Sequence, residues 1–415
     1  MKLLELSAYF YPEQFASSYL WENVSEAIAK EGINRVVCCP MPCRGISEDV
    51  RKKYKKKNNE YMYEGRLHVI RFSLFKEGKG TILRAIRYFL MDAYMFLWAI
   101  GSRNAKDCQI VYAGSTPPIQ GALAALVKKW KKIPFLYNLQ DIFPDSLVGT
   151  GLAKRGGILW KIGRMIEDFT YYNADKIIVI SEDFKKNLLS KGVPEEKIVV
   201  IYNWVDETAV VDVPREENKL FSKYDLQPSK FYITYNGNIG LTQNMDMLLE
   251  VAKEFEANED IQFVLVGNGA YLEQVEKIIK DDNITNVHLL PFQPYEDISH
   301  VFSLGDVSLV ISKPGVGANS VPSKTWSIMS ASRPVLANFD ENELKTIIEE
   351  NNCGIFTKAG DKVAFIDAIL KLYNDRELCK EMGKNGRQFV MDNLTKEVGT
   401  QKYVDVIKSV ALNNC

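Results

Sequence analysis

A single lysine in the second half of the sequence lies in a turn whose residue types suit anion binding. Residues 320–335 read Ser-Val-Pro-Ser-Lys-Thr-Trp-Ser-Ile-Met-Ser-Ala-Ser-Arg-Pro-Val, a polar turn that opens a helix and leads into an apolar strand. Pro322 favours a helix start and Ser323 can cap it, so free backbone amides and the Lys324 ammonium would face a ligand at the positive helix end. A phosphorylated ligand fits this turn, but so does an ordinary capped helix with a solvated lysine.

Two glycine turns in the same half of the chain favour the phosphate interpretation. Residues 236–244 follow an apolar strand and read Asn-Gly-Asn-Ile-Gly-Leu-Thr-Gln-Asn, and the next strand ends in Gly-Asn-Gly at 267–269. Glycines let backbone amides approach an anion closely, although strand-to-helix turns also use glycine for steric reasons alone. Because all three turns follow strands of one half, we expect a phosphate-bearing ligand there. Its expected contacts are Gly237, Asn238, Gly240, Gln243, Gly267, Asn268, Gly269, Lys313, Ser320, Pro322, Ser323 and Lys324.

These turns need a scaffold that brings strand ends together, and the pattern of the whole chain predicts one. Short apolar runs alternate with helical periodicity from end to end, which is typical of doubly wound parallel sheets. The expected strands are 3–6, 35–39, 69–72, 110–112, 135–137, 177–180 and 199–201, then 232–235, 263–266, 287–290, 307–311, 335–337 and 354–356. Ligands of such sheets bind at the carboxyl ends of the strands, so chemistry is expected in the loops that follow them.

The same pattern predicts two α/β domains. We expect an N-terminal domain over residues 1–205 and a second domain over 206–392, because segment 206–230 is charged, poor in strands and contains two prolines. Residues 393–415 read as a last helix, whose periodicity alone fits packing anywhere; we expect it to pack back on the N-terminal domain. Two facing domains of this kind would enclose a cleft.

The composition argues against several classes of protein. The 415 residues carry 52 Lys and Arg against 53 Asp and Glu, so no net positive charge draws the chain to nucleic acid. Seven cysteines without metal-ligand spacing favour a reducing cytoplasm, and the first residues already read as a strand, which leaves no room for a signal peptide. The three histidines, His68, His288 and His300, do not lie beside a candidate nucleophile, which argues against hydrolase triads and most metal enzymes.

Two segments could contact a membrane surface. Residues 82–100 are strongly apolar and flanked by arginines, but Asp92 interrupts the run before it reaches the ~20 residues that a bilayer requires. A core helix and an interfacial helix both fit this segment. The basic run 51–57 reads as a solvated loop that anionic lipid could attract. Peripheral attachment to a membrane is therefore a hypothesis from the sequence.

The sequence resembles the family 4 retaining glycosyltransferases, whose GT-B architecture has two facing Rossmann-like domains with a central cleft. In the second half the resemblance rests on residues 201–206, the two glycine turns and residues 330–337. In the first half, residues 115–118 and 139–145 are similar to the branch that builds bacterial surface polysaccharides, nearest to the N-acetylfucosamine transferases of O-antigen and capsule assembly. The resemblance implies retaining hexosyl transfer, without metal or cofactor, from a UDP-linked sugar to a polyprenyl-diphosphate-linked saccharide at the cytoplasmic face of the inner membrane.

The chain departs from the family pattern around the lysine turn. Most members carry two glutamates there, and the matching positions here are Asn319 and Ser327. Many members also place an arginine and a lysine on the first glycine loop, where this chain has Asn238 and Gln243. Lys324 is therefore expected to supply the catalytic charge that stabilises a leaving diphosphate. The weaker candidates for this charge are Lys313 and Arg333.

The other substrate of such a reaction, the sugar acceptor, is expected on the first domain. Asp141 follows the apolar strand at 135–137, and its carboxylate can accept a hydrogen bond from a sugar hydroxyl; a helix cap is the alternative role. Asp145, in the same loop, is a second choice. Residues 9–18 stand where relatives carry a glycine-rich acceptor loop. The expected contacts there are Phe15, Ser17 and Ser18, although helix capping and core packing also fit them.

Three hypotheses on function stay open at this point. The first is the retaining glycosyltransferase, with Asp141 and Lys324 as the residues closest to the chemistry. A nonhydrolysing sugar-nucleotide epimerase shares the architecture, but it depends on several histidines, which are scarce here. A non-catalytic subunit that binds sugar nucleotides is the third, because the two family glutamates are missing.

Overall fold

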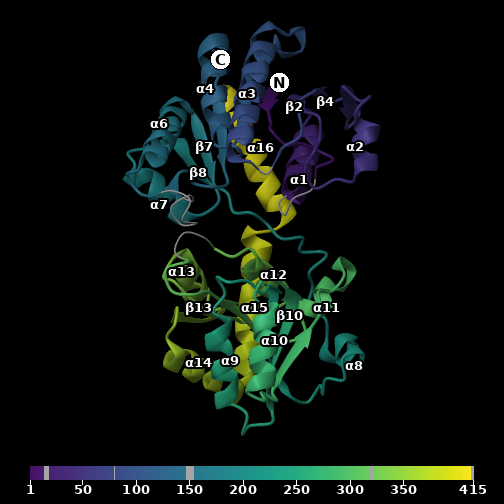
Figure 1. Ribbon diagram of the computed structural model, residues 1–415, viewed down its shortest axis with the longest axis vertical. Helices are drawn as coiled ribbons and strands as arrows, with labels where there is room; N and C mark the ends of the chain where they lie inside the picture. The colour runs from purple at the N-terminus through teal and green to yellow at the C-terminus, as the bar shows by residue number, and fades with distance from the viewer. Residues whose placement is uncertain (14–17, 79, 146–153, 318–320, 413–415) are drawn as a thin grey trace. The chain divides into compact units, whose positions relative to one another are not determined.

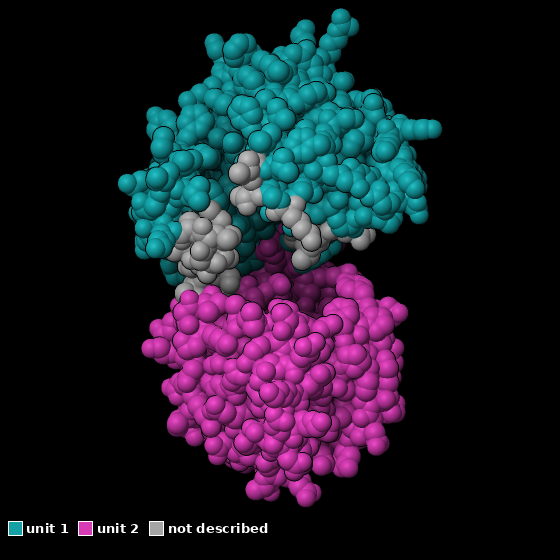
Figure 2. All heavy atoms as spheres, viewed as in Figure 1, with its two compact units in different colours: residues 1–202, 399–415 teal, residues 203–398 magenta. Residues whose placement is uncertain are grey.

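The structure is a computed structural model that describes residues 1–13, 18–78, 80–145, 154–317 and 321–412. The chain divides into two compact units, which Figure 2 colours separately. Unit 1 comprises residues 1–202 and 399–415, and unit 2 comprises residues 203–398. The N-terminal unit is therefore built from two separate stretches of the sequence.

The described residues of unit 1 form an eight-stranded sheet in the order β3-β4-β2-β1-β5-β6-β7-β8. Neighbouring strands are parallel except β3 and β4, which form an antiparallel pair. The strands are β1 (Lys2–Leu6), β2 (Asn34–Pro40), β3 (Asn59–Met62), β4 (Leu67–Phe72), β5 (Ile110–Gly114), β6 (Phe135–Leu139), β7 (Lys176–Val179) and β8 (Ile198–Val200). Continuous apolar runs in β1, β2, β5 and β6 are buried, as expected for strands covered on both faces.

Helices connect these strands and cover the sheet (Figure 1). They are α1 (Ser18–Lys30), α2 (Glu48–Tyr54), α3 (Thr81–Gly101), α4 (Ile119–Lys131), α6 (Ile158–Asn173) and α7 (Glu182–Ser190). Residues of α3, α4 and α6 form one core with alternate residues of the strands, including Leu4, Val111 and Tyr137. None of the helices among the described residues is both long and apolar enough to cross a membrane.

Unit 2 repeats the scheme with a six-stranded parallel sheet in its described residues, in the order β11-β10-β9-β12-β13-β14. The strands are β9 (Phe231–Asn238), β10 (Ile261–Asn268), β11 (Val287–Leu290), β12 (Val307–Ile311), β13 (Val335–Phe339) and β14 (Gly354–Lys358). The helices are α8 (Leu220–Lys223), α9 (Met245–Glu254), α10 (Leu272–Asp281), α11 (Ile298–Phe302), α12 (Lys324–Ser330), α13 (Glu343–Glu350), α14 (Lys362–Asn374) and α15 (Arg376–Asn393). The predicted fold class of two parallel-sheet α/β domains is confirmed.

Each strand expected from the sequence is present, but one strand and one helix were not foreseen. The basic run 51–57 was predicted to be a solvated loop; in the structure its first residues belong to α2, and the antiparallel strand β3 follows. Ser47 caps α2 by accepting from the amide of Val50, and Glu48 and Asp49 lie in the first turn. The sequence contains this capping residue, but the run of lysines that follows it favoured the prediction of a solvated loop.

The last helix, α16 (Lys396–Leu412), begins in unit 2 and continues into unit 1. Within unit 1 the buried Tyr403 hydroxyl lies 3.2 Å from the side-chain oxygen of Asn138 in β6. Lys408 forms an ion pair with Glu31 at 2.6 Å. These contacts fix the end of the chain to the sheet of unit 1.

Candidate functional site

The two glycine turns lie at the ends of neighbouring parallel strands in unit 2. In the pairing of β9 with β10, Gly237 is opposite Gly267 and Asn238 is opposite Asn268. Both glycines have positive φ, +124° and +155°. A Cβ atom on Gly267 would lie 1.9 Å from the carbonyl oxygen of Gly237, so only glycine allows the two backbones to approach this closely.

The amides of these turns have partners within the turns themselves. The Gly240 amide donates to the side-chain oxygen of Gln243 at 3.1 Å, and the Gly269 amide donates to that of Asn268 at 2.7 Å. The sequence predicts that such amides face a phosphate directly, whereas the structure places a neutral side-chain oxygen on each. An anion that replaced either oxygen would meet the same donor.

Lys324 is the charged group that lies against this part of unit 2. Its Nζ lies 3.7 Å from the ring centroid of Tyr235 and 3.9 Å from the Cβ position of Gly237. The residue is partly exposed, but Nζ is buried and has no hydrogen-bond partner among the described residues. Burial lowers the pKa of Lys324 from 10.5 to about 7. A buried ammonium without a counter-charge is unfavourable, so this position favours binding of an anion.

Other buried polar groups that lack partners accompany Lys324, and sequence reasoning missed them. Thr234 and Ser308 face each other on β9 and β12, and their hydroxyls are 2.7 Å apart. Further along the same face, the side-chain carboxamide of Asn236 and the Ser312 hydroxyl are buried without a partner in the part of the chain that the structure describes. The same holds for the Thr325 hydroxyl. Unused buried donors and acceptors at strand ends mark a place where a polar ligand can bind.

The predicted cap of the lysine helix is wrong. Ser323 has helical dihedral angles and makes no side-chain capping bond among the described residues. The reason is that the amides of Thr325 and Trp326 already donate to the carbonyls of Pro322 and Ser323. Helix α12 also spans only seven residues. The side chain of Lys324, rather than a row of free amides, is therefore what this turn offers to an anion.

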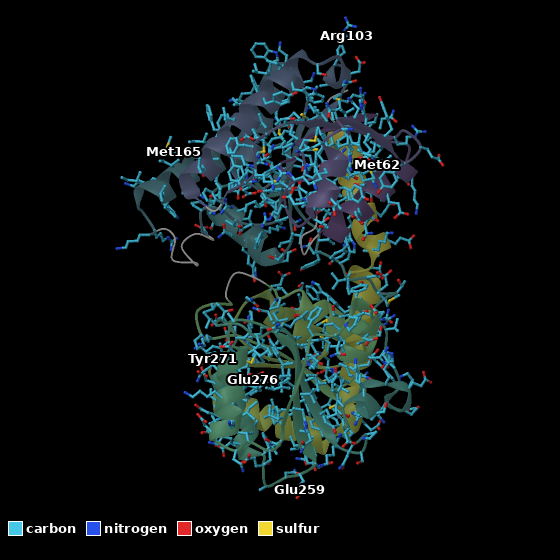
Figure 3. All side chains as sticks on the ribbon, turned by 45° about the vertical axis from the view of Figure 1, so that its right-hand side comes forward. Met62, Arg103, Met165, Glu259, Tyr271 and Glu276 are labelled. Atoms are coloured by element: carbon cyan, nitrogen blue, oxygen red, sulfur yellow. The ribbon has the colours of Figure 1, made fainter. Side chains whose placement is uncertain are left out.

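Arg333 and Lys313, the other candidates for the positive charge at this site, lie in different surroundings. Arg333 donates to the carbonyls of Gly305 and Ser303 and pairs with Asp212 at 2.8 Å, so it is committed to packing beyond the end of α12. Lys313 follows β12, and its Nζ lies 5.4 Å from the ring centroid of Tyr271, a residue labelled in Figure 3. Lys313 therefore remains near the glycine turns, and Arg333 does not supply their charge. Ser320 and Asn319 lie outside the described residues.

Unit 1 contains a pocket of about 580 Å³. Residues that follow β1, β5 and β6 line it, among them Ser7, Ser115 and Gln140. Its walls combine aromatic rings with charged and amide groups. The lining includes Tyr9, Phe10, Tyr11, Trp21, Tyr63, Glu5, Glu13, Glu22, Arg44 and Gln120. Aromatic rings beside polar and charged groups suit a ligand that has both apolar faces and hydroxyls.

Glu13 organises this pocket, although sequence reasoning did not select it. Its buried carboxylate accepts from the backbone amides of Cys43 and Arg44, each at 2.8 Å, and from the amide of Phe10 at 3.1 Å. Burial raises the pKa of Glu13, and these amide bonds act in the opposite direction. Glu13 therefore joins the loop after β1 to the loop after β2.

The predicted acceptor residues are only partly gathered at this pocket. Ser18 lines it. Asp141 is exposed, two residues after the end of β6, and is not among the lining residues. Asp145 pairs with Lys191 at 2.8 Å; burial alone would raise its pKa, but the Lys191 and Asn187 contacts lower it. Phe15 and Ser17 lie outside the described residues.

No group of three or more His, Cys, Asp or Glu side chains among the described residues is placed to hold a metal ion. His68 contacts Asn59, and His288 contacts Gln262. Both histidines therefore have structural partners.

Comparison with known families and proteins agrees with this arrangement. Residues 18–209 match the family described as Glycosyltransferase Family 4, and residues 216–389 match Glycosyl transferases group 1. WbjE of Pseudomonas aeruginosa, named as a glycosyltransferase, is 23% identical over 412 residues, which cover 98% of each chain. WcaI of Escherichia coli, named as a colanic acid biosynthesis glycosyl transferase, is 26% identical over 345 residues, 80% of this chain and 81% of its own.

Among solved structures, Anabaena HepE in complex with UDP has a similar fold. The TM-score is 0.72 with 16% identity, and the alignment covers 99% of this chain and 100% of HepE. The two matched families together span both units, so the chain belongs to the glycosyltransferases, with a family 4 domain in its first half and a group 1 domain in its second.

Proposed function

We propose that this protein transfers a sugar from a nucleotide diphosphate to a lipid-linked saccharide, with retention of the anomeric configuration. The observation that carries this proposal is the buried Nζ of Lys324, which lies beside Gly237 without a hydrogen-bond partner among the described residues. A diphosphate bound at these strand ends would supply the counter-charge that the buried ammonium lacks.

The proposed donor is a UDP-sugar. Support comes from the fold shared with HepE, which was solved with UDP and with UDP-glucose. In this chain the unused polar groups of Asn236 and Ser312 would add hydrogen bonds to the polar parts of the same ligand. Gly237, Asn238, Gly240, Gln243 and the turn at 267–269 would lie along the diphosphate, with Lys313 near its edge.

In the proposed reaction, Lys324 stabilises the leaving group. When the anomeric bond of the donor breaks, negative charge builds on the diphosphate, and an ammonium already fixed beside it lowers the barrier. The departing phosphate oxygen takes the proton of the acceptor hydroxyl, so the scheme requires no protein base and no metal. The protein then mainly holds and orients the two substrates.

The proposed acceptor saccharide binds to unit 1, in the pocket organised by Glu13. Tyr9, Trp21 and Tyr63 would cover the apolar faces of a sugar ring, and Gln140 would bond its hydroxyls. Asp141 follows Gln140 and is the proposed contact at the rim. The exposed position of Asp141 is compatible with binding of substrate.

The proposed biological setting is the synthesis of a surface polysaccharide, such as O-antigen or capsule, at the cytoplasmic face of the inner membrane. Residues 115–118 and 139–145 support it through their similarity to the corresponding transferases, and WcaI is named for colanic acid biosynthesis. N-acetylfucosamine, or a related amino-deoxyhexose, is the proposed donor sugar.

A substrate panel tests this function. Purified protein is incubated with a series of UDP-sugars, with and without a polyprenyl-diphosphate-linked sugar and with and without EDTA, and release of UDP is followed by mass spectrometry. The expected result is release that depends on acceptor and is unaffected by EDTA, with an α-configured product by NMR when the donor is α-linked. Isomerised donor in the absence of acceptor would indicate an epimerase instead. Binding without turnover for any pair would indicate a non-catalytic subunit. That alternative is considered because Ser327 stands where relatives carry a glutamate.

A further inference from the structure

Helix α3 exposes an apolar face along most of its length. Its inner side, including Met91 and Met95, is buried in the core of unit 1. On its outer side Phe89 and Leu97 are 66% and 65% exposed, and Leu83, Ile86, Leu90 and Tyr94 are exposed as well. From residue 85 to residue 101 the exposed positions of this helix carry no charged side chain. An ordinary surface helix places polar and charged residues on that side, so this face requires an explanation.

Helices α4 and α6 extend the same apolar surface. Helix α3 packs against α4, and α4 packs against α6 (Figure 1). The ring of Phe96 in α3 meets Trp130 in α4 edge-on, with centroids 6.4 Å apart. Trp130 is 67% exposed, and Met165 of α6 is 71% exposed and points away from the ribbon in Figure 3. The other exposed apolar residues are Leu126 of α4 and Ile158, Leu159, Ile162 and Tyr172 of α6. We call this surface the three-helix face.

The charge of these segments is opposite to that of the rest of the chain. Residues 81–107, 119–132 and 154–173 together carry twelve Lys and Arg and four Asp and Glu, a net charge of +8, whereas the whole chain has −1. Lys129, Lys131 and Lys132 end α4, and Arg103 follows α3. Positive charge around exposed aromatic and aliphatic side chains is complementary to anionic lipid headgroups above an acyl layer.

The same charge argues against a second copy of the chain as the occupant. A two-fold dimer would place this surface against itself and bring the exposed Lys129 and Lys132 of one copy near those of the other. A bilayer with anionic headgroups meets no such repulsion. A spanning role is excluded for α3 because its inner side is part of the core.

The three-helix face is also connected to the pocket of unit 1. Helices α4 and α6 follow β5 and β6, and residues just after these strands, Ser115 and Gln140, line the pocket. In the first half of α3 the hydroxyl of Tyr88 lies 3.0 Å from that of Tyr9, a pocket residue, and both bond to Glu77. A saccharide that reaches this pocket from a lipid anchor would therefore come from the side where these helices begin.

We infer that the three-helix face docks unit 1 onto an anionic membrane surface, with Phe89, Leu97 and Trp130 entering the interface and the lysines at the end of α4 contacting the headgroups. The inference rests on the proposed function for its purpose, since an enzyme that uses a lipid-linked acceptor must reach that lipid. Its evidence, however, is the exposed apolar area and the charge of the helices, which are independent of the donor site.

Vesicle co-sedimentation of the full chain tests this inference without any sugar nucleotide. We expect binding to vesicles that contain phosphatidylglycerol, weak binding to pure phosphatidylcholine, and weaker binding as the salt concentration rises. The double variants Phe89→Ser/Leu97→Ser and Lys131→Glu/Lys132→Glu should each lower the partition coefficient at least 10-fold. The matched control is Phe292→Ser/Val363→Ser, which removes apolar residues of similar exposure, 75% and 70%, from unit 2 and should bind as the wild type does.

Two further measurements keep the outcome decisive. UDP binding by each variant separates loss of docking from loss of the donor site; unchanged UDP affinity with lost vesicle binding supports the inference, whatever the acceptor proves to be. If the serine variants do not fold, Leu97→Cys labelled with an environment-sensitive dye should shift its emission to the blue on phosphatidylglycerol vesicles, and Val363→Cys should not. Equal vesicle binding by wild type and face variants, or a lipid-independent dimer that Phe89→Ser/Leu97→Ser dissociates, would overturn the inference.

Discussion

At the scale of single residues, Lys324 combines two properties that are hard to reconcile without a ligand. Its Nζ is buried, yet it stands over the ring of Tyr235 and near the backbone of Gly237 rather than next to a carboxylate. The face of an aromatic ring attracts a cation only modestly. No carboxylate among the described residues bonds to this Nζ, so the proposed diphosphate would be its principal partner.

Replacing Lys324 with methionine keeps the length of the side chain and removes the charge. If Lys324 stabilises the leaving diphosphate, Lys324→Met should lower kcat by ~100-fold or more, while the thermal unfolding temperature stays equal or rises, because a buried charge is removed. Initial rates at saturating donor, together with differential scanning fluorimetry, measure both effects. Near-normal rates in a folded variant would assign the role to another cation, with Lys313→Met as the comparison.

The lowered pKa of Lys324 also predicts a coupling between donor binding and protons. Burial lowers this pKa to about 7, so above pH 7 the free lysine is mostly neutral, whereas a bound diphosphate favours its charged form. UDP binding at pH 8 should therefore take up a proton, and affinity should fall as the pH rises through 7. Titration calorimetry in two buffers of different ionisation enthalpy measures the uptake, which Lys324→Met should abolish.

The lowered pKa of Lys324 also determines how the stability of the fold changes with pH. The unfolded lysine keeps its usual pKa of 10.5, so between pH 7 and 10.5 the unfolded state binds more protons than the folded state. The contribution of Lys324 to the free energy of unfolding therefore increases with pH over this window and is least favourable below pH 7. A stability-versus-pH curve for Lys324→Met should lack this rise.

At the scale of elements, the ends of β9 and β10 depend on a close backbone approach. A Cβ on Gly267 would clash with the Gly237 carbonyl oxygen at 1.9 Å, and its φ of +155° disfavours other residues. The turn at the proposed donor site is therefore fixed by steric contacts as well as by hydrogen bonds.

Gly267→Ala should destabilise unit 2 by about 2 kcal/mol or more and weaken UDP binding, because the two strand ends must separate. Gly78→Ala is the matched control: it has open space around its Cβ position and no positive φ, so it should change stability by less than about 0.5 kcal/mol. Urea unfolding measures the first effect and calorimetric titration of UDP the second. If Gly267→Ala were as stable as Gly78→Ala, the close approach described here would be wrong.

The elements also show which parts of the site are visible in the sequence. Strand ends followed by glycine or lysine turns are local patterns, so the glycine turns and Lys324 could be selected without coordinates. Glu13 could not, because its partners, the amides of Cys43 and Arg44, are brought close only by the loop after β2. Asn236 and Ser312 resemble ordinary strand residues until the sheet is assembled and leaves them without partners among the described residues. The cap assigned to Ser323 failed because backbone carbonyls competed for the same amides.

At the scale of the whole molecule, the net charge of the chain gives no sign of the proposed membrane-docking surface. A chain of −1 reads as having no electrostatic preference, yet segments of unit 1 that sum to +8 are balanced by acidic residues elsewhere. The sequence left residues 82–100 open between a core helix and an interfacial helix. In the structure one side of this helix belongs to the core and the opposite side is exposed, since Met91 is buried and Phe89 is exposed.

The path of the last helix has a consequence for how the protein is made. Unit 1 includes residues 399–415, and Tyr403 of α16 bonds to Asn138, which also accepts a hydrogen bond from Gln140 on the wall of the pocket. During synthesis, the first two hundred residues emerge before this helix exists, and the residues of unit 2 are translated in between. The first domain to leave the ribosome is thus the last to be completed. Until α16 has been made, the surface of unit 1 that this helix covers stays accessible to chaperones.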